Sequence, residues 1–131
     1  MGSFSDYWEN EILDHIFGKG SYTSPTIYVG LSTADPTDDG TGLAEPVGNA
    51  YARVSTVAAD WTVASSGALN NVNDITFPEA TGNWGTVTHF ALFDAVTGGN
   101  MLAHGALSSS KAIGSGDTAK FAAGDLEVSL D

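Results

Sequence analysis

The sequence predicts a mainly β protein, an antiparallel β-sandwich of jelly-roll type with one amphipathic helix near the N-terminus. Short segments rich in β-branched and aromatic residues alternate with clusters of Gly, Pro and Asp along most of the chain. Helical spacing of apolar residues occurs once, at the start. Only 15% of the 131 residues are charged and 16 are glycine, a composition that suits strands and turns better than a helical bundle.

The length of the chain is typical of one compact domain that can bury a sizeable core. We expect residues 1–20 to form the helix and a linker, and residues 21–131 to form a single β-sandwich domain. No repeat of solenoid length interrupts this organisation.

A helix is predicted from Phe4 to Phe17. Ser3 or Ser5 can cap its first turn, and the glycines that follow Phe17 end it. A helix of about 13 residues is marginal on its own, so we expect its apolar stripe to pack on its own sheet or on a neighbouring subunit. The stripe consists of Phe4, Trp8, Ile12, Leu13, Ile16 and Phe17.

Seven strands are predicted after the helix, separated by turn residues. The segment 34–49, dense in Gly, Pro and Asp, is predicted to be a long exposed loop, which we call the acidic loop. The strands are expected within residues 26–33, 50–57, 73–77, 85–93, 100–107, 118–123 and 126–131, with weaker candidates at 61–63 and 69–72.

Two of the three histidines lie in the most apolar hairpin of the chain. Pairing of Asp94 with Gly99 would place His89 directly opposite His104, whereas a register shifted by one residue would turn the two rings to opposite faces. We favour the first register and expect the helix or another subunit to cover the histidine face. The core face would then consist of Phe90, Leu92, Met101 and Ala103.

The charge balance excludes several classes of partner. Sixteen acidic and four basic residues give a formal net charge of -12, which repels phosphate backbones and anionic lipid heads. We therefore predict neither a nucleic-acid nor a membrane partner. The absence of cysteine excludes disulfides and thiolate metal sites.

No sequence pattern indicates catalysis or a cofactor, and we predict a protein that is not an enzyme and holds no metal. The carboxylates around Gly40 are of the type that calcium binds, but their spacing is not that of an EF-hand and no helix flanks them. A solvated acidic turn is the preferred interpretation. A metal at His89 and His104 would lack a third ligand nearby in the sequence.

We predict instead that the function of this chain depends on an interface and on a homo-oligomer. Trp8 is the most informative residue, because a large apolar side chain near a chain end implies that something covers it. The candidate interface residues are Trp8, Ile12, Ile16, Phe17, His89 and His104.

Five segments together resemble a family of small tailed-phage virion structural proteins, commonly labelled tail-fibre-like or minor structural proteins. These segments are SDYWENEILDHIFG, IYVGLSTADPTDDGTG, GNAYARV, GNWGTVTHFALFDAVTGGNMLAHGAL and SGDTAKFAAGDLEVSLD. The resemblance implies a structural protein on the outer surface of the virion that passes through the host cytoplasm during assembly.

Two virion roles fit this resemblance. We favour a capsid decoration or cement protein that contacts the major capsid protein or another virion protein, because the chain is short and lacks the repeats and coiled coils of a fibre. The alternative is a tail-tip or tail-fibre-associated protein that binds a host receptor. Its support is the acidic loop and a set of aromatic residues, for which packing in the core or at an interface is the preferred interpretation and stacking on a sugar is the alternative. The set consists of Tyr22, Tyr28, Tyr51, Trp61 and Trp84.

Overall fold

The computed structural model describes residues 2–130, so residues 1 and 131, at the ends of the two predicted segments, lie outside it. It contains one seven-stranded sheet of order β3-β2-β6-β7-β1-β9-β4 and a separate two-stranded sheet, β5-β8. The strands are β1 (Gly2–Phe4), β2 (Tyr28–Ser32), β3 (Val54–Ser55), β4 (Ala68–Asn70), β5 (Ile75–Thr76), β6 (Gly85–Phe93), β7 (Met101–Ile113), β8 (Lys120–Phe121) and β9 (Glu127–Ser129).

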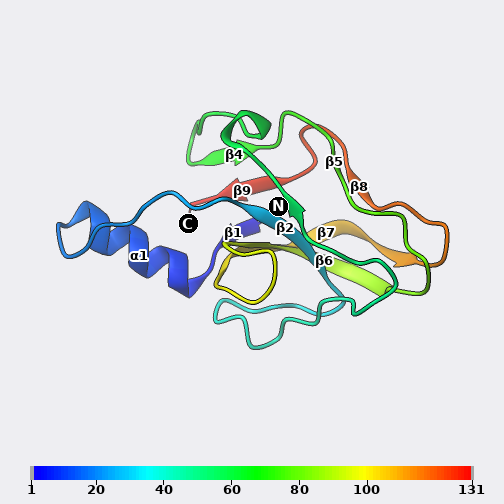
Figure 1. Ribbon diagram of the computed structural model, residues 1–131. Coiled ribbons are helices and arrows are strands. Elements are labelled where there is room, and N and C mark those ends of the chain that lie inside the picture. Colours follow the sequence, from blue (N-terminus) through cyan, green and yellow to red (C-terminus); the bar gives the residue numbers. More distant parts are fainter. Residues whose placement is uncertain (1, 131) are drawn as a thin grey trace.

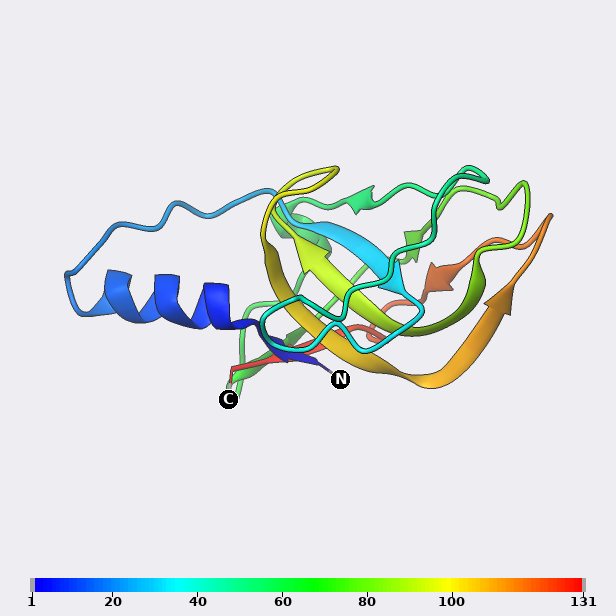
Figure 2. The ribbon, with the colours of Figure 1, turned by 90° about the horizontal axis from the view of Figure 1, so that it is seen from below.

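The large sheet curls strongly around its core (Figures 1 and 2). Among the described residues, the paired strands are antiparallel except β1 with β9, which are parallel. The predicted mainly β, antiparallel fold with one N-terminal helix is confirmed. The core side chains include Val29, Leu31, Phe90, Leu92, Leu102 and Val128, all less than 5% exposed.

The helix α1 (Asp6–Ile16) begins two residues later than predicted. Phe4 belongs instead to β1, which pairs with β7 through Gly2 and Gly105. Ser5 ends the strand and caps the helix, since its hydroxyl accepts a hydrogen bond from the Trp8 amide at 3.3 Å. The first apolar residue of the predicted stripe is therefore a sheet residue.

The β6-β7 hairpin is longer than predicted. β7 runs to Ile113, six residues beyond the predicted end of this strand at residue 107. The turn closes with Asp94 paired to Asn100 rather than to Gly99, because the Asp94 carboxylate accepts hydrogen bonds from the Asn100 amide at 2.7 Å and from its side chain at 2.9 Å. The favoured register is therefore wrong.

Two irregularities in the hairpin change which side chains lie on each face of the sheet. Phe93 pairs with Met101, and a shift at the next step pairs Leu92 with Ala103. Met101 consequently lies with Phe93 and Ala91 on the face away from the main core, not on the predicted core face. A second shift between Val87 and His89 buries Val87 in the core.

The remaining predicted strands are present in shortened form. The segment 50–57 contributes only β3, and the segments 73–77 and 118–123 contribute β5 and β8. A short 3₁₀ turn, η1 (Ala58–Asp60), follows β3. Within the described residues, the only α-helix has 11 residues and lacks the length and apolar content needed to span a membrane.

Candidate functional site

The predicted interface residues fall in three separate places. Trp8 and Ile12 border cavities between α1 and the sheet. Ile16 and Phe17 lie at the far end of α1, away from the sheet. The two histidines lie on the face of the sheet that the acidic loop covers. The structure therefore provides an apolar surface and a distinct polar cluster.

The far end of α1 presents apolar side chains to solvent. Leu13, Ile16 and Phe17 are 55%, 68% and 73% exposed, and their spacing of three and four residues places them on one side of the helix. No residue of α1, which is described in full, is buried. We call α1 together with Phe17 the arm, which projects from one side of the sheet (Figure 2). Leu13 was absent from the candidates, although its place in the predicted stripe could have identified it.

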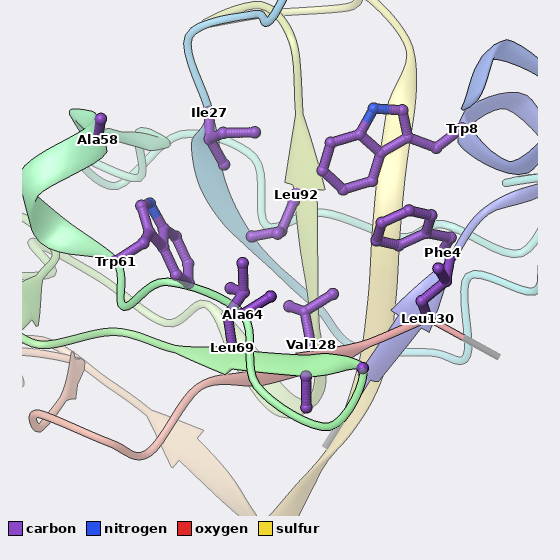
Figure 3. Close-up of a pocket in the computed structure, with 12 residues that line it drawn as sticks. Phe4, Trp8, Ile27, Ala58, Trp61, Ala64, Leu69, Leu92, Val128 and Leu130 are labelled. Atoms are coloured by element: carbon purple, nitrogen blue, oxygen red, sulfur yellow. The ribbon is translucent and has the colours of Figure 1, made fainter. Parts of the chain in front are cut away.

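An apolar cavity of about 410 Å³ opens at the base of the arm (Figure 3). Trp8 and Phe4 lie on one side of it, Trp61 lies on the other, and Leu92 lies between them. Phe4 and Trp8 pack together with ring centroids 4.3 Å apart. We call this cavity the apolar groove, and its lining consists of Phe4, Trp8, Ile27, Ala58, Trp61, Ala64, Gly67, Ala68, Leu69, Leu92, Val128 and Leu130.

A second cavity of about 650 Å³ continues the groove along the inner side of α1. Ile12 and His15 of the helix line it opposite the extended segment 24–27. The two cavities share four lining residues, so they form one continuous depression from the sheet to the middle of the helix. The shared residues are Trp8, Ile27, Ala58 and Trp61.

Two buried polar atoms border this depression. The indole Nε1 of Trp8 and the hydroxyl of Tyr22 are shielded from solvent, and neither has a hydrogen-bond partner of good geometry among the described residues. Burial raises the pKa of the Tyr22 hydroxyl, and the nearby Trp8 indole N–H partly opposes this rise. The base of the arm therefore carries two neighbouring buried polar atoms without a hydrogen-bond partner of good geometry among the described residues.

The composition of the groove limits what it can bind. Its lining residues are apolar side chains and one glycine, without any carboxylate, ammonium, guanidinium or imidazole group. Such a surface favours the binding of apolar side chains and offers no charged or ionisable partner to a polar or charged ligand. The lining therefore offers no side chain for acid-base chemistry within this groove.

The histidines form a polar cluster under the acidic loop. The Nε2 of His104 lies 2.8 Å from Asp38 Oδ1, and its Nδ1 lies 3.9 Å from Asp35 Oδ1. His89 instead contacts the neighbouring Thr88 hydroxyl at 2.8 Å. The local irregularity of β6 brings these sequence neighbours together, since adjacent residues of a regular strand point to opposite faces.

The histidines are diagonal neighbours rather than direct partners. His89 pairs with Ala106, and His104 pairs with Ala91, two residues along β6 from His89. They share a face because each histidine is two residues, an even number, from the position directly opposite the other. Within the chain, the acidic loop and not the helix lies against this face, because Asp35 and Asp38 approach His104. The described residues contain no group of three or more metal-ligating side chains.

A buried ion pair holds the acidic loop in place. The Arg53 guanidinium binds both carboxylate oxygens of Glu45, at 2.6 and 3.0 Å, and stacks 3.4 Å above the Phe93 ring. The Tyr51 hydroxyl donates a hydrogen bond to Glu45 at 2.6 Å. The pKa of Tyr51 is raised, mainly by burial and secondly by this hydrogen bond. These contacts fix the loop on the sheet, and Tyr51 is one of several predicted sugar-stacking aromatics that serve packing instead.

The aromatic set does not form a platform. Trp84 is 4% exposed and contacts Tyr51 edge-on, whereas Trp61 lies in the apolar groove. Tyr22 lies at the base of the arm and Tyr28 packs beside Phe93. The hypothesis of a shared sugar-stacking surface is therefore wrong.

Comparison with protein-family models matches residues 3–129 to the family described as Podophage GP4 fiber I protein gp80. A comparison with curated proteins finds no match. The family match includes both the arm and the sheet, and it agrees with the resemblance drawn from the five segments. The chain belongs to this phage fibre family and is a structural protein of the virion.

Proposed function

We propose that this protein is part of the tail-fibre apparatus on the outside of the phage particle, where it binds other virion proteins and catalyses no reaction. The fibre description of its family supports the tail over the capsid shell, which the sequence alone favoured. The observation that carries the proposal is the arm. An arm whose far end exposes three apolar side chains and whose base borders an apolar groove is a means of attachment to other proteins.

The surface charge supports an outer position. A net charge of -12 opposes contact with packaged DNA and keeps many copies apart in solution. The exposed apolar residues of the arm and groove are then the places where this repulsion is overcome by burial of apolar surface.

Labelling of intact particles tests the location. Gold-labelled antibodies against the chain should bind the tail region, and quantitative mass spectrometry should give few copies per particle. Labels spread over the shell, with hundreds of copies, would contradict the fibre role and support capsid decoration. Particles assembled with the Phe17→Ser variant should lose the protein if the arm is the attachment, whereas particles with Val47→Ser should retain it. Val47 is 90% exposed and lines neither cavity.

Absence of catalysis is a separate part of the proposal. Purified protein incubated with polysaccharide from host cells should release no new reducing ends above a boiled control. Steady release that depends on native protein would overturn this part and leave the location test unaffected.

A further inference from the structure

We propose that the arm of one copy inserts into the apolar groove of a second copy, so that the protein assembles head to tail with itself. This inference rests on the proposed attachment role of the arm and adds the identity of its partner. The occupant is the apolar end of α1 with Phe17, and the receiving surface is the groove between Trp8 and Trp61.

The two surfaces match in chemistry and size. Ile16 and Phe17 offer apolar side chains that are mostly exposed, and the groove offers a charge-free cavity of about 410 Å³. A cavity of this size can enclose one or two large side chains, as anchor residues require in protein interfaces. The cavity that continues along α1 provides space for the following residues of the incoming arm.

The arm cannot fill its own groove. Trp8 forms a wall of the groove, and Ile16 follows it by eight residues, which is about 12 Å along the helix axis. The helix leads away from the sheet, and the chain returns separately to β2 (Figure 2). Insertion of its own end would require α1 to unwind, so an arm that enters the groove belongs to another copy.

The apolar end of the arm and the uncharged groove allow two acidic copies to meet, although α1 itself carries Asp6, Glu9, Glu11 and Asp14. Two chains of net charge -12 repel each other unless their contact avoids acidic surface. The groove lining contains no charged residue. Lys19, the only basic residue before Arg53, follows the end of the arm, and Asp60 adjoins the groove residue Trp61. These opposite charges suit an arm that enters beside η1.

The arm and the groove are different surfaces, so each copy has one donor and one acceptor. Such a contact is heterologous and generates a ring where the rotation between copies closes. It differs from a symmetric pairing of two helices, in which the arms would contact each other.

Cross-linking tests the contact directly, because the chain contains no cysteine. One preparation carries Phe17→Cys, and the other carries Ala64→Cys at the exposed mouth of the groove. Oxidation of the mixture should form disulfides between the two variants. A mixture of Phe17→Cys with Val47→Cys serves as the matched control and should form them at a far lower yield. Disulfides only between two Phe17→Cys chains would overturn the proposal in favour of paired helices.

Complementation provides a second test in solution. By analytical ultracentrifugation, Phe17→Ser should weaken self-association of the full chain about tenfold or more, and so should Ala64→Trp, which fills the groove. A mixture of these two variants should form heterodimers, since one arm and one groove remain intact. A wild-type chain that stays monomeric at every concentration would overturn the inference, whereas the proposed function would stand if particle labelling still located the chain on the tail.

Discussion

His104 on β7 and Asp38 on the acidic loop are joined by a 2.8 Å contact between Nε2 and Oδ1, although 66 residues separate them in the sequence. The loop is also bound to the start of α1, because the Asp6 amide donates to the Asp38 carbonyl at 2.9 Å. Asp38 therefore links the sheet, the loop and the base of the arm.

Replacement of His104 by Ala should loosen this link without unfolding the protein. Asp38 is 61% exposed at its side chain, so we expect a loss of less than about 1 kcal/mol in the free energy of unfolding. Hydrogen exchange should accelerate at the Asp6 amide. His89→Ala is the control, because its ring contacts Thr88 of its own strand and should leave the Asp6 amide protected. Equal acceleration in both variants would contradict the assignment.

Replacement of Arg53 by Lys should destabilise the fold by about 2 kcal/mol. The lysine keeps the charge but loses the paired contacts to Glu45, the stacking on Phe93 and the hydrogen bonds to the carbonyls of Ala95 and Gly98. Chemical denaturation measures the change. The reciprocal Lys111→Arg, at an exposed position of β7, should alter stability by less than about 0.5 kcal/mol. An Arg53→Lys variant with unchanged stability would show that the paired geometry of the guanidinium contributes nothing to the free energy of unfolding.

The pKa of the Asp39 carboxyl should be about 2 in the native protein, below its ordinary value of 3.8. Hydrogen bonds from the Thr37 hydroxyl and from Thr41 favour the ionised form. Because the folded state lowers this pKa, its contribution to stability is present above pH 3.8 and is lost as the pH falls through about 2.

Carbon-detected NMR titration of the carboxyl carbons tests this value. Thr37→Ala removes the strongest of these hydrogen bonds and should raise the pKa of Asp39 toward 3.8. A native titration centred near 3.8 would show that the loop hydrogen bonds do not persist in solution.

Replacement of Asn71 by Ala should cost about 2 kcal/mol or more. Its amide is 1% exposed and donates to the carbonyls of Asn73 and Ala122, while its oxygen accepts from the Leu126 amide at 2.9 Å. Loss of the side chain leaves these buried groups unpaired. Asn70→Ala removes a single exposed contact to Gly124 and should cost less than half as much. Thermal unfolding of both variants compares the stability lost with the buried hydrogen bonds of Asn71 with that lost with the exposed one of Asn70.

The parts of the fold that local spacing determines could be predicted from the sequence. The helix was found because its apolar residues repeat within one segment, and its N-cap was among the two serines considered. The strand β1 was missed because it has three residues and owes its form to β7 and β9, which lie a hundred or more residues away. Its apolar Phe4 was consistent with either element.

The register of the β6-β7 hairpin and the location of the groove were harder to predict from the sequence for a similar reason. The shift at Leu92 depends on cross-strand hydrogen bonds that a loop length does not specify. Trp8 packs on Phe4, and its part in an interface stays a prediction. The groove itself was out of reach, because Trp61 and Leu130 join it from segments whose positions only the tertiary fold determines.

The position of β1 between β7 and β9 has a mechanical consequence. Figure 2 shows β1 continuing directly into α1, so a pull on the arm acts along the strand. The hydrogen bonds of β1 to both neighbours are then loaded in shear and resist together, rather than peeling apart one after another. A strand held from both sides in this way suits an arm that bears a load at its far end.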